Sequence, residues 1–360
     1  METFTPPHCP NPTCPFHWPT TGWSFKKSGF FSRLHCRPTL IQRYQCCHCQ
    51  RSFSSQTFST SYWLHQPNLQ PTIFHRILAC SGLRQIAHEL NVAHSTVLNH
   101  LARLGRHCLL FQHQLRPSPR EPLVLDGFES FEYSQYFPCH FHVLVGKDSH
   151  FFYLFTDSPL RRKGRMTQTQ QRRRAALERR LGRPDPKSIP KQVAELLRLG
   201  VPQPGALTLH TDDHPAYPRA FRQVPHLAIE HQVTSSKERR TTRNPLFPVN
   251  LLDLLIRHGG ANHKRETIAF SKRRQAALER LAIVQVWRNF LKAFSERKGG
   301  PTPAQRLGLV RERLTVKEVL ARRLFASRVR LPEALERYYR REVTTPALGV
   351  NRTHRLRYAY

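Results

Sequence analysis

Two aspartates follow apolar runs that have the length and composition of β-strands. Asp126 comes directly after residues 123–125 (LVL), and Asp212 ends the run 206–211 (ALTLHT). Short apolar runs bounded by turn residues indicate buried strands, so each carboxylate is expected at a strand end. Carboxylates at adjacent strand ends can share two Mg²⁺ ions ~4 Å apart, one activating an attacking oxygen and one stabilising a leaving oxygen. These residues could therefore support metal-dependent phosphoryl transfer.

A third acidic residue has two candidates. Asp253 lies in the segment 249–257, whose apolar spacing predicts a helix, and Glu266 follows the glycine pair 259–260, which is expected to end that helix. We favour Asp253 as the third acid and keep Glu266 as the alternative. An ordinary structural role, such as capping a strand end or pairing with an arginine, is the competing interpretation for all of these carboxylates.

Cysteines in the first 50 residues form a second group with its own chemistry. The chain has nine cysteines, an odd number without signs of secretion, so metal binding is expected rather than disulfides. Four thiolates can close a tetrahedral zinc site, and the expected ligands are Cys9, Cys14, Cys46 and Cys49. The second pair has the usual CxxC spacing, whereas the first is wider, and the alternative ligands are Cys36, Cys47, His8, His17 and His48. With strand-like residues beside the second pair, this predicts a zinc-ribbon-like module over 1–60 that needs the metal to fold.

The segment 68–112 has the pattern of a helix, a short turn and another helix. Its apolar positions would pack the helices together: Ile73, Ile77, Ile86, Leu90, Val97 and Leu101. On the other face of the last helix lie side chains suited to base and phosphate contacts, namely Ser95, Thr96, Asn99, His100 and Arg103. The pattern predicts a helix-turn-helix DNA-binding domain, with an ordinary helical hairpin as the alternative.

The rest of the chain supplies the elements that would position the acids. After a proline-rich linker at 116–122, strands are expected near 123–126, 141–145, 151–155, 206–212 and 227–230. A basic helical insert at 161–200 interrupts them, and a helix within 272–294 has apolar spacing suited to packing on the sheet. The region 296–360 is expected to be helical and basic, with an undetermined role.

The charge of the chain points to a polyanionic partner. The 57 Lys and Arg residues against 24 Asp and Glu give a formal net charge of +33. Such an excess repels itself unless a polyanion neutralises it, and nucleic acid is the favoured partner. No apolar run has the length of a membrane span and no Gly-rich phosphate loop is present, so we expect a soluble cytoplasmic protein that does not hydrolyse nucleotides.

Four motifs together resemble insertion-sequence transposases of the DDE type. They are residues 125–129 (LDGFE), 211–217 (TDDHPAY), 262–271 (NHKRETIAFS) and 287–289 (WRN). The resemblance implies an α/β (α+β) fold with a ribonuclease-H-like catalytic core at 121–295, in which Asp126 and Asp212 are the first two metal-binding acids. It further implies catalytic Mg²⁺ or Mn²⁺, structural Zn²⁺, double-stranded DNA as partner, a homo-oligomer, and nucleoid association in a prokaryotic cell.

Two other functions fit parts of the sequence. A zinc-dependent DNA-binding transcription regulator without catalysis would account for the first 110 residues and for the charge, but it gives the strand-end aspartates no role. A ribonuclease-H-like nuclease would use the same acids without joining a 3′-hydroxyl end to new DNA. The fate of the cleaved end separates the nuclease from the transposase.

Overall fold

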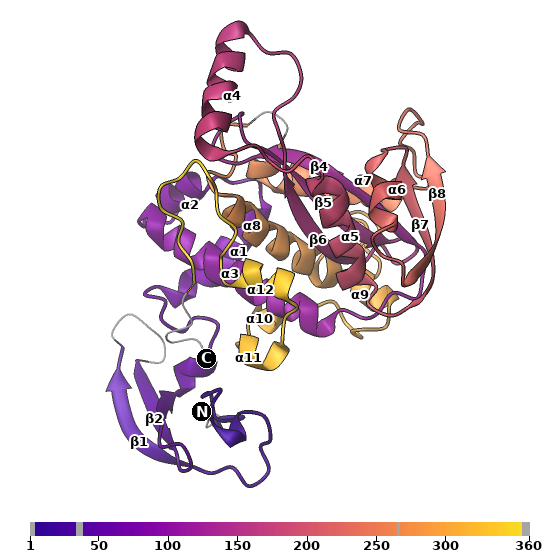
Figure 1. The fold of residues 1–360 in the computed structure, drawn as a ribbon. Coiled ribbons are helices and arrows are strands. Elements are labelled where there is room, and N and C mark those ends of the chain that lie inside the picture. The colour runs from indigo at the N-terminus through magenta and orange to yellow at the C-terminus, as the bar shows by residue number, and fades with distance from the viewer. Residues whose placement is uncertain (1–3, 34–38, 265–266, 355–360) are drawn as a thin grey trace.

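A computed structural model of the chain describes residues 4–33, 39–264 and 267–354, and it contains two β-sheets with helices around them (Figure 1). The N-terminal part forms an antiparallel three-stranded sheet of β1 (Phe25–Ser32), β2 (Leu40–Cys46) and β3 (Ser52–Ser54) in that order. Its 3₁₀ turns are η1 (Pro15–His17) and η2 (Ser55–Phe58). A small aromatic core fills it, in which Tyr44, Phe53 and Phe58 are buried together with cysteines.

The larger sheet has five strands in the order β6-β5-β4-β7-β8. Their bounds are β4 (Leu123–Phe131), β5 (Pro138–Gly146), β6 (Phe152–Pro159), β7 (Gly205–Asp212) and β8 (Leu227–Thr234). The first three pair antiparallel through short turns, whereas β7 pairs parallel with both β4 and β8. The strands expected from the apolar runs are therefore present, and the sheet is mixed, with helical connections where parallel strands require them.

Helices cover both faces of this sheet. On one face lies α5 (Ser188–Gly200), where the Thr156 hydroxyl donates to the carbonyl of Gln192 at 2.9 Å. On the other face lie α7 (Phe247–Gly259) and η4 (Ala261–His263), whose His263 ring contacts Phe128 and Phe141. Because both faces are covered, β5 and β6 are almost continuously buried rather than alternately buried and exposed.

The helices before the sheet share its hydrophobic core. They are η3 (Pro67–Leu69), α1 (Gln70–Leu78), α2 (Leu83–Glu89) and the long α3 (His94–Leu115). α3 packs against α8 (Arg274–Val286) so closely that a Cβ on Gly105 would lie 2.6 Å from the Cβ of Glu279. α3 ends at Leu115, three residues beyond the predicted segment 68–112, and its buried residues join the core that continues into β4.

α8 continues into the π-helical turn η5 (Trp287–Leu291), which forms hydrogen bonds to the edge strand of the sheet. The side-chain amide of Asn289 accepts from the backbone N–H of Phe152 at 2.8 Å and donates to its carbonyl at 2.9 Å. Phe152 begins the edge strand β6, whose outer backbone groups lack a strand partner. The Phe152 carbonyl also accepts from Gln285 at 3.0 Å and from Gln112 at 3.3 Å, so buried side-chain amides pair the backbone of this edge residue.

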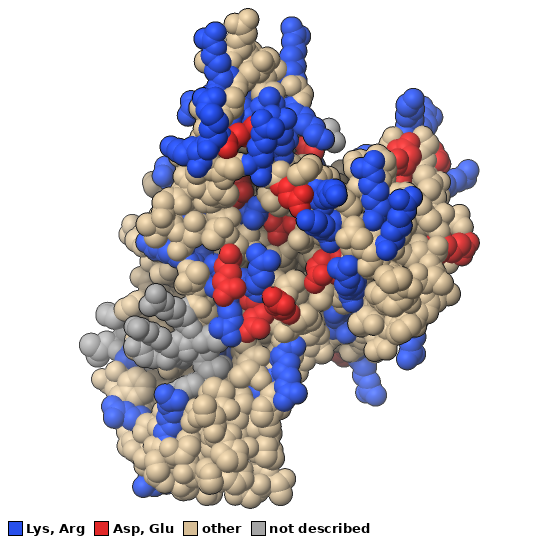
Figure 2. Space-filling model, viewed as in Figure 1, with Lys and Arg blue, Asp and Glu red and all other residues tan. Residues whose placement is uncertain are grey.

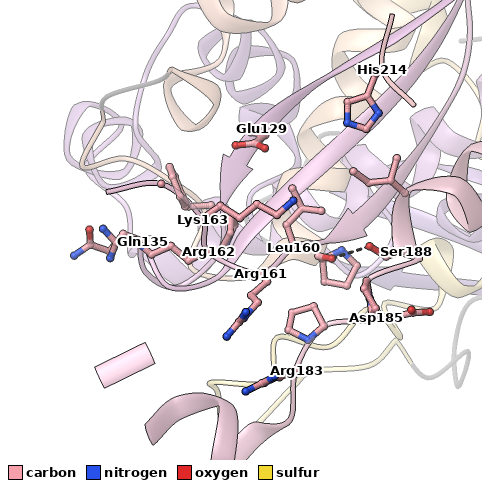
Figure 3. A pocket seen from close by; sticks show the side chains of 17 residues that line it. Glu129, Gln135, Leu160, Arg161, Arg162, Lys163, Arg183, Asp185, Ser188 and His214 are labelled. Carbon is pink, nitrogen blue, oxygen red and sulfur yellow. Dashed lines mark hydrogen bonds between the residues drawn. The ribbon is translucent and has the colours of Figure 1, made fainter. Parts of the chain in front are cut away.

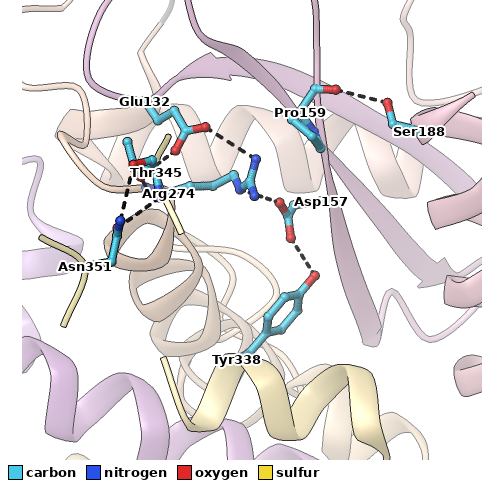
Figure 4. Close-up of polar contacts among 8 residues, drawn as sticks. All are labelled: Glu132, Asp157, Pro159, Ser188, Arg274, Tyr338, Thr345 and Asn351. Carbon is cyan, nitrogen blue, oxygen red and sulfur yellow. Dashed lines mark hydrogen bonds and ion pairs between the residues drawn. The ribbon is translucent and has the colours of Figure 1, made fainter. Parts of the chain in front are cut away.

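The segment after η5 contains only short helices and returns to the rest of the molecule. These are α9 (Pro303–Arg306), α10 (Val316–Val319), α11 (Ala326–Val329) and α12 (Glu333–Tyr339). A buried polar network ties it to the sheet, as Figure 4 shows: Arg274 Nε lies 2.8 Å from Asp157, the Tyr338 hydroxyl donates to Asp157 at 2.7 Å, and Thr345 donates to Glu132 at 2.6 Å. The expected helical C-terminal region is thus a packed part of the fold.

Two connections leave the body of the sheet. Between β6 and α5, residues 160–187 carry α4 (Gln168–Leu181), which projects from the molecule and has no buried side chain (Figure 1). Between β7 and β8 lies the short α6 (Ala216–Phe221), packed on α5. No helix in the described part of the chain is long and apolar enough to cross a membrane.

Candidate active site and metal centre

The register of two parallel strands brings the first two aspartates level with each other. Leu123 of β4 pairs with Leu209 of β7, so Asp126 and Asp212, each three residues further along, lie at the same height. The pairing covers only residues 123 and 124 of β4, and beyond it the strands no longer pair, which leaves room between the two carboxylates. Asp212 is the last residue of β7, as expected. Asp126 is the fourth residue of β4, so the expectation that it lies at a strand end was wrong: the strand continues to Phe131 because it stays paired with β5.

The third aspartate reaches the same place from a helix. Asp253 lies on α7, which packs against β4 and β5, and it lines one cavity together with Asp126 and Asp212. The cavity has a volume of about 820 Å³, and polar side chains that also line it are Glu129, His140, Arg240, Asn250 and Arg257. Glu266, the alternative third acid, lies outside the described residues. The structure therefore gathers three sequence-selected aspartates from β4, β7 and α7.

Burial shifts the pKa values of Asp126 and Asp253 upward. Burial raises the pKa of Asp126 to about 6, the backbone N–H of Gly127 opposes the shift, and the charge of Asp212 adds to it. Burial likewise raises the pKa of Asp253 to about 8, with a further contribution from Asp126, against the opposing charges of Arg257 and Arg240. Several acids held close in a dry site favour either bound protons or a bound cation.

One carboxylate oxygen of Asp253, Oδ1, is buried and has no hydrogen-bond partner within the described ranges. Carboxylate oxygens are the donors that Mg²⁺ and Mn²⁺ prefer, so the donor set fits a hard divalent cation. The three aspartates do not form a tight cluster, because among described side chains only the cysteines discussed below bring three or more ligand atoms within 4.8 Å of one another. Two divalent metal ions held ~4 Å apart could bridge carboxylates that are spaced more widely than the ligands of a single ion.

Glycine next to Asp126 is required by close packing. A Cβ on Gly127 would lie 2.3 Å from Cε1 of His140 and 2.3 Å from the carbonyl oxygen of Phe141. The glycine therefore leaves space for His140, which lines the aspartate cavity from β5. Sequence reasoning did not select His140, nor Arg240, which lies outside the helices and strands, and no sequence spacing connects these two residues to the acids. Tyr217 belongs to the motif 211–217 and donates a hydrogen bond to Asp126, a contact that the motif alone does not predict.

We expect Asp253→Asn to stabilise the metal-free protein at alkaline pH. Because the folded-state pKa is about 8 against an ordinary 3.8, the wild type loses stability as pH rises from about 4 through about 8. The variant lacks this titration, so its unfolding free energy should exceed that of the wild type by on the order of 2–5 kcal/mol at pH 8 and by much less at pH 4. Urea unfolding in EDTA-free, zinc-containing buffer without Mg²⁺ measures both. Asp148→Asn, at an exposed turn residue, is the control, and an equal difference at both pH values would contradict the expectation.

Four cysteines converge at the N-terminal sheet. Their sulfur atoms all lie within 4.8 Å of one another, and the group consists of Cys9, Cys14, Cys46 and Cys49. A tetrahedral zinc ion with Zn–S bonds of ~2.3 Å places its sulfurs ~3.8 Å apart. The Cys9–Cys49 and Cys14–Cys46 sulfur distances are 3.6 and 4.0 Å, which bracket that value. The quartet chosen from the sequence is thus brought together and could hold a zinc ion.

The surroundings of Cys46 favour its thiolate form. Burial opposes ionisation, but hydrogen bonds from the Cys49 and His48 backbone and from the Trp23 indole, whose Nε1 lies 3.3 Å from Sγ, lower the pKa of Cys46 to about 7. Burial raises the pKa of Cys9 and of Cys14. Hydrogen bonds donated to a ligand atom orient that ligand and tune the properties of a bound metal ion.

The alternative ligands lie elsewhere or have other partners. Nδ1 atoms of His8 and His17 contact the Cys9 carbonyl at 3.0 and 2.8 Å, and Cys47 is exposed. The His48 ring packs against Phe16. Cys36 lies outside the described residues. The histidines therefore support the backbone of a ligand rather than replace one.

The α2–α3 pair presents only part of the surface expected to contact DNA. Ser95 and Asn99 are exposed at the start of α3 and Thr96 is half-buried. His100 is 1% exposed, and Arg103 is half-buried with Nη2 donating to the Tyr62 carbonyl at 2.6 Å. The expectation that these last two stay on the exposed face differs from the structure because the 59–66 loop packs against this side of α3.

Comparisons with other proteins add little to these observations. No protein-family model matches the chain, and no curated protein matches it. A chain of a solved structure, described as the simian T-cell lymphotropic virus intasome in complex with PP2A regulatory subunit B56 gamma, matches with 17% sequence identity and a TM-score of 0.26. The match covers 65% of this chain and 71% of that chain. A likeness at that TM-score supports no argument, so function is inferred from the residues of this chain.

Proposed function

We propose that this chain is a DNA transposase of the DDE insertion-sequence type. The observation that carries the proposal is the convergence of Asp126 on β4, Asp212 at the end of β7 and Asp253 on α7 in one cavity. Three antiparallel strands, two further parallel strands and an acid-bearing helix are the elements of the ribonuclease-H-like core that the sequence motifs imply. We assign that core to residues 121–295.

The three aspartates would hold divalent metal, Mg²⁺ or Mn²⁺. Such ions activate an attacking oxygen and stabilise the leaving oxygen of a phosphodiester. The residues of this chain supply the carboxylate oxygens, a largely dry wall and two arginines at the cavity, Arg240 and Arg257. Arginine beside the acids offsets their repulsion and offers donors to phosphate oxygens.

Nucleic acid as substrate is supported by charge and by a second site. The net charge of +33 favours a polyanionic partner, and Figure 2 shows Lys and Arg gathered over the projecting segment that carries α4. At the start of α3, the exposed Ser95 and Asn99 and the half-buried Thr96 would contact DNA, while His100 and Arg103 would act by supporting that helix. The zinc-ribbon-like module and a homo-oligomeric assembly that pairs two DNA ends complete the proposal.

Analysis of the DNA products tests this function against a nuclease. Duplexes carrying the sequences that flank the gene for this chain are incubated with the protein, Mg²⁺ and a target plasmid. A transposase joins the cleaved 3′-hydroxyl end to the plasmid, and Asp253→Asn loses both cleavage and joining while retaining DNA binding. Cleavage without joining would instead indicate a nuclease. Binding without either reaction in the wild type would favour a regulator that contains zinc.

A further inference from the structure

A second hollow lies beside the aspartate cavity and shares a wall with it. Glu129 and Phe131 of β4 line both, so the two hollows adjoin at these side chains. The second hollow also has a volume of about 820 Å³. Its other wall is the chain that follows β6 and the chain that precedes α5, and its cationic side chains are Arg161, Arg162, Lys163 and Arg183 (Figure 3).

The hollow combines a cationic rim with an apolar floor. Phe131, Leu160 and the proline rings of 138, 159 and 184 line it below the basic side chains. An acidic peptide would use the rim alone. A nucleic acid strand uses both, because its phosphates face the cations while its sugars and bases present apolar faces. The composition of the hollow therefore favours a polynucleotide strand.

One glutamate arranges the arginines of the rim. Glu178 of α4 receives Arg161 through two hydrogen bonds, Nε to Oε1 at 2.8 Å and Nη2 to Oε2 at 3.1 Å, and it also holds Arg183 at 3.0 Å and Arg174 at 3.6 Å. A single carboxylate thus orients three guanidinium groups and neutralises only one of them. Arg162 is placed separately, over the ring of Tyr136 at 5.0 Å.

The positive charge of residues 161–183 is not balanced by acidic residues within the segment. Residues 161–183 contain ten basic side chains and one acid, and α4 buries none of its side chains. An isolated helix of this length is marginal in water, and like charges destabilise it further. Figure 2 shows Lys and Arg gathered over the projection. A polyanion lying along it would remove this repulsion.

We propose that this second hollow binds the sugar–phosphate backbone of the DNA strand that enters the aspartate cavity, with residues 161–187 as a basic arm whose two ends form one wall of the hollow. The inference rests on the proposed function, since it names where the substrate strand lies next to that site. Guanidinium groups match phosphate oxygens in geometry as well as charge, which suits arginines fixed by Glu178 to a strand in one position.

The test is the salt dependence of DNA binding by the full-length protein. Arg162→Ala, Lys163→Ala and Arg183→Ala are combined, and the control combines Arg297→Ala, Lys298→Ala and Arg313→Ala, three exposed cations outside both hollows. Both are made in an Asp126→Asn background so that binding is read without cleavage. The probe is a fluorescein-labelled DNA duplex with a single-stranded tail, followed by anisotropy at several salt concentrations.

We expect the arm variant to bind roughly 10–100-fold more weakly and its log–log salt slope to fall by about 2 to 3, because each lost phosphate contact removes about 0.7–0.9 from the slope. The control triple should change the slope much less. The inference would be overturned if the arm variant and the control variant had the same salt slope. It would also be overturned if the arm variant lost as much affinity for polyglutamate as for DNA. DNA cleavage that still requires Asp126 would, in that case, leave the proposed function standing.

Discussion

Asp126→Asn should lower the rate of DNA strand cleavage by about 10³-fold or more, because a lost metal ligand removes several kcal/mol of transition-state stabilisation. Asparagine is nearly isosteric with aspartate, Asp126 is half-buried, and its raised pKa shows that the surroundings already favour a neutral side chain, so the fold should persist. DNA binding should stay within a few-fold of the wild type. Initial cleavage rates with Mg²⁺ and with Mn²⁺, alongside anisotropy, measure the two effects.

Asp213→Asn provides a matched control for this variant. Asp213 follows Asp212 directly, but its carboxylate is exposed and accepts from the backbone and hydroxyl of Ser236 at 3.3 and 3.4 Å. The same chemical change one residue away from the cavity should therefore leave cleavage nearly intact. Similar losses in Asp126→Asn and Asp213→Asn would mean that the cavity acids act through general charge and not through metal.

Cys46→Ser should abolish zinc binding and unfold the N-terminal module. The apparent free energy of structural zinc in small modules is ~10–16 kcal/mol at neutral pH, which exceeds what the small aromatic core can replace. The effect should spread to the C-terminal segment, because Phe325 belongs to the same core and His17 contacts the Ser327 hydroxyl at 2.9 Å. Hydrogen exchange should therefore become fast both in 40–58 and in 322–330.

The neighbouring cysteine separates metal loss from a general effect of substitution. Cys47 is exposed and lies outside the quartet, so Cys47→Ser should keep one zinc per chain and slow exchange in both segments. Zinc content is read by atomic spectroscopy on the same samples. Retention of zinc and of slow exchange in Cys46→Ser would show that the quartet is not the metal centre.

Local patterns predicted the elements that carry the site. Apolar runs ending in Asp126 and Asp212 indicated strands, and helical spacing indicated the helix that bears Asp253, because each signal lies within a few residues. The convergence of these three in one cavity depends on strand order and register, which no local pattern encodes. The zinc quartet was predictable for a similar reason, since metal ligands must occur at fixed short spacings.

Features that the local sequence patterns did not predict depend on packing between residues that are distant in the sequence. α3 looked like the recognition helix of a separate domain, yet it extends to Leu115 and shares its core with the sheet. Burial of His100 follows from the 59–66 loop lying against it, a contact that helical periodicity does not report. The C-terminal segment appeared only as short helices, and its packing against the zinc module depends on residues such as Arg323, which donates to the carbonyls of Phe58 and Thr57.

The most direct test of the central claim is Mn²⁺ binding to the zinc-loaded protein in complex with DNA, followed by electron paramagnetic resonance. We expect the wild type to bind Mn²⁺ at the aspartate cavity, and Asp126→Asn and Asp253→Asn each to lose that binding with the zinc content unchanged. Asp213→Asn should bind as the wild type does. Equal Mn²⁺ binding by the wild type, Asp126→Asn and Asp253→Asn would contradict the account, because the three aspartates would then not form a metal site.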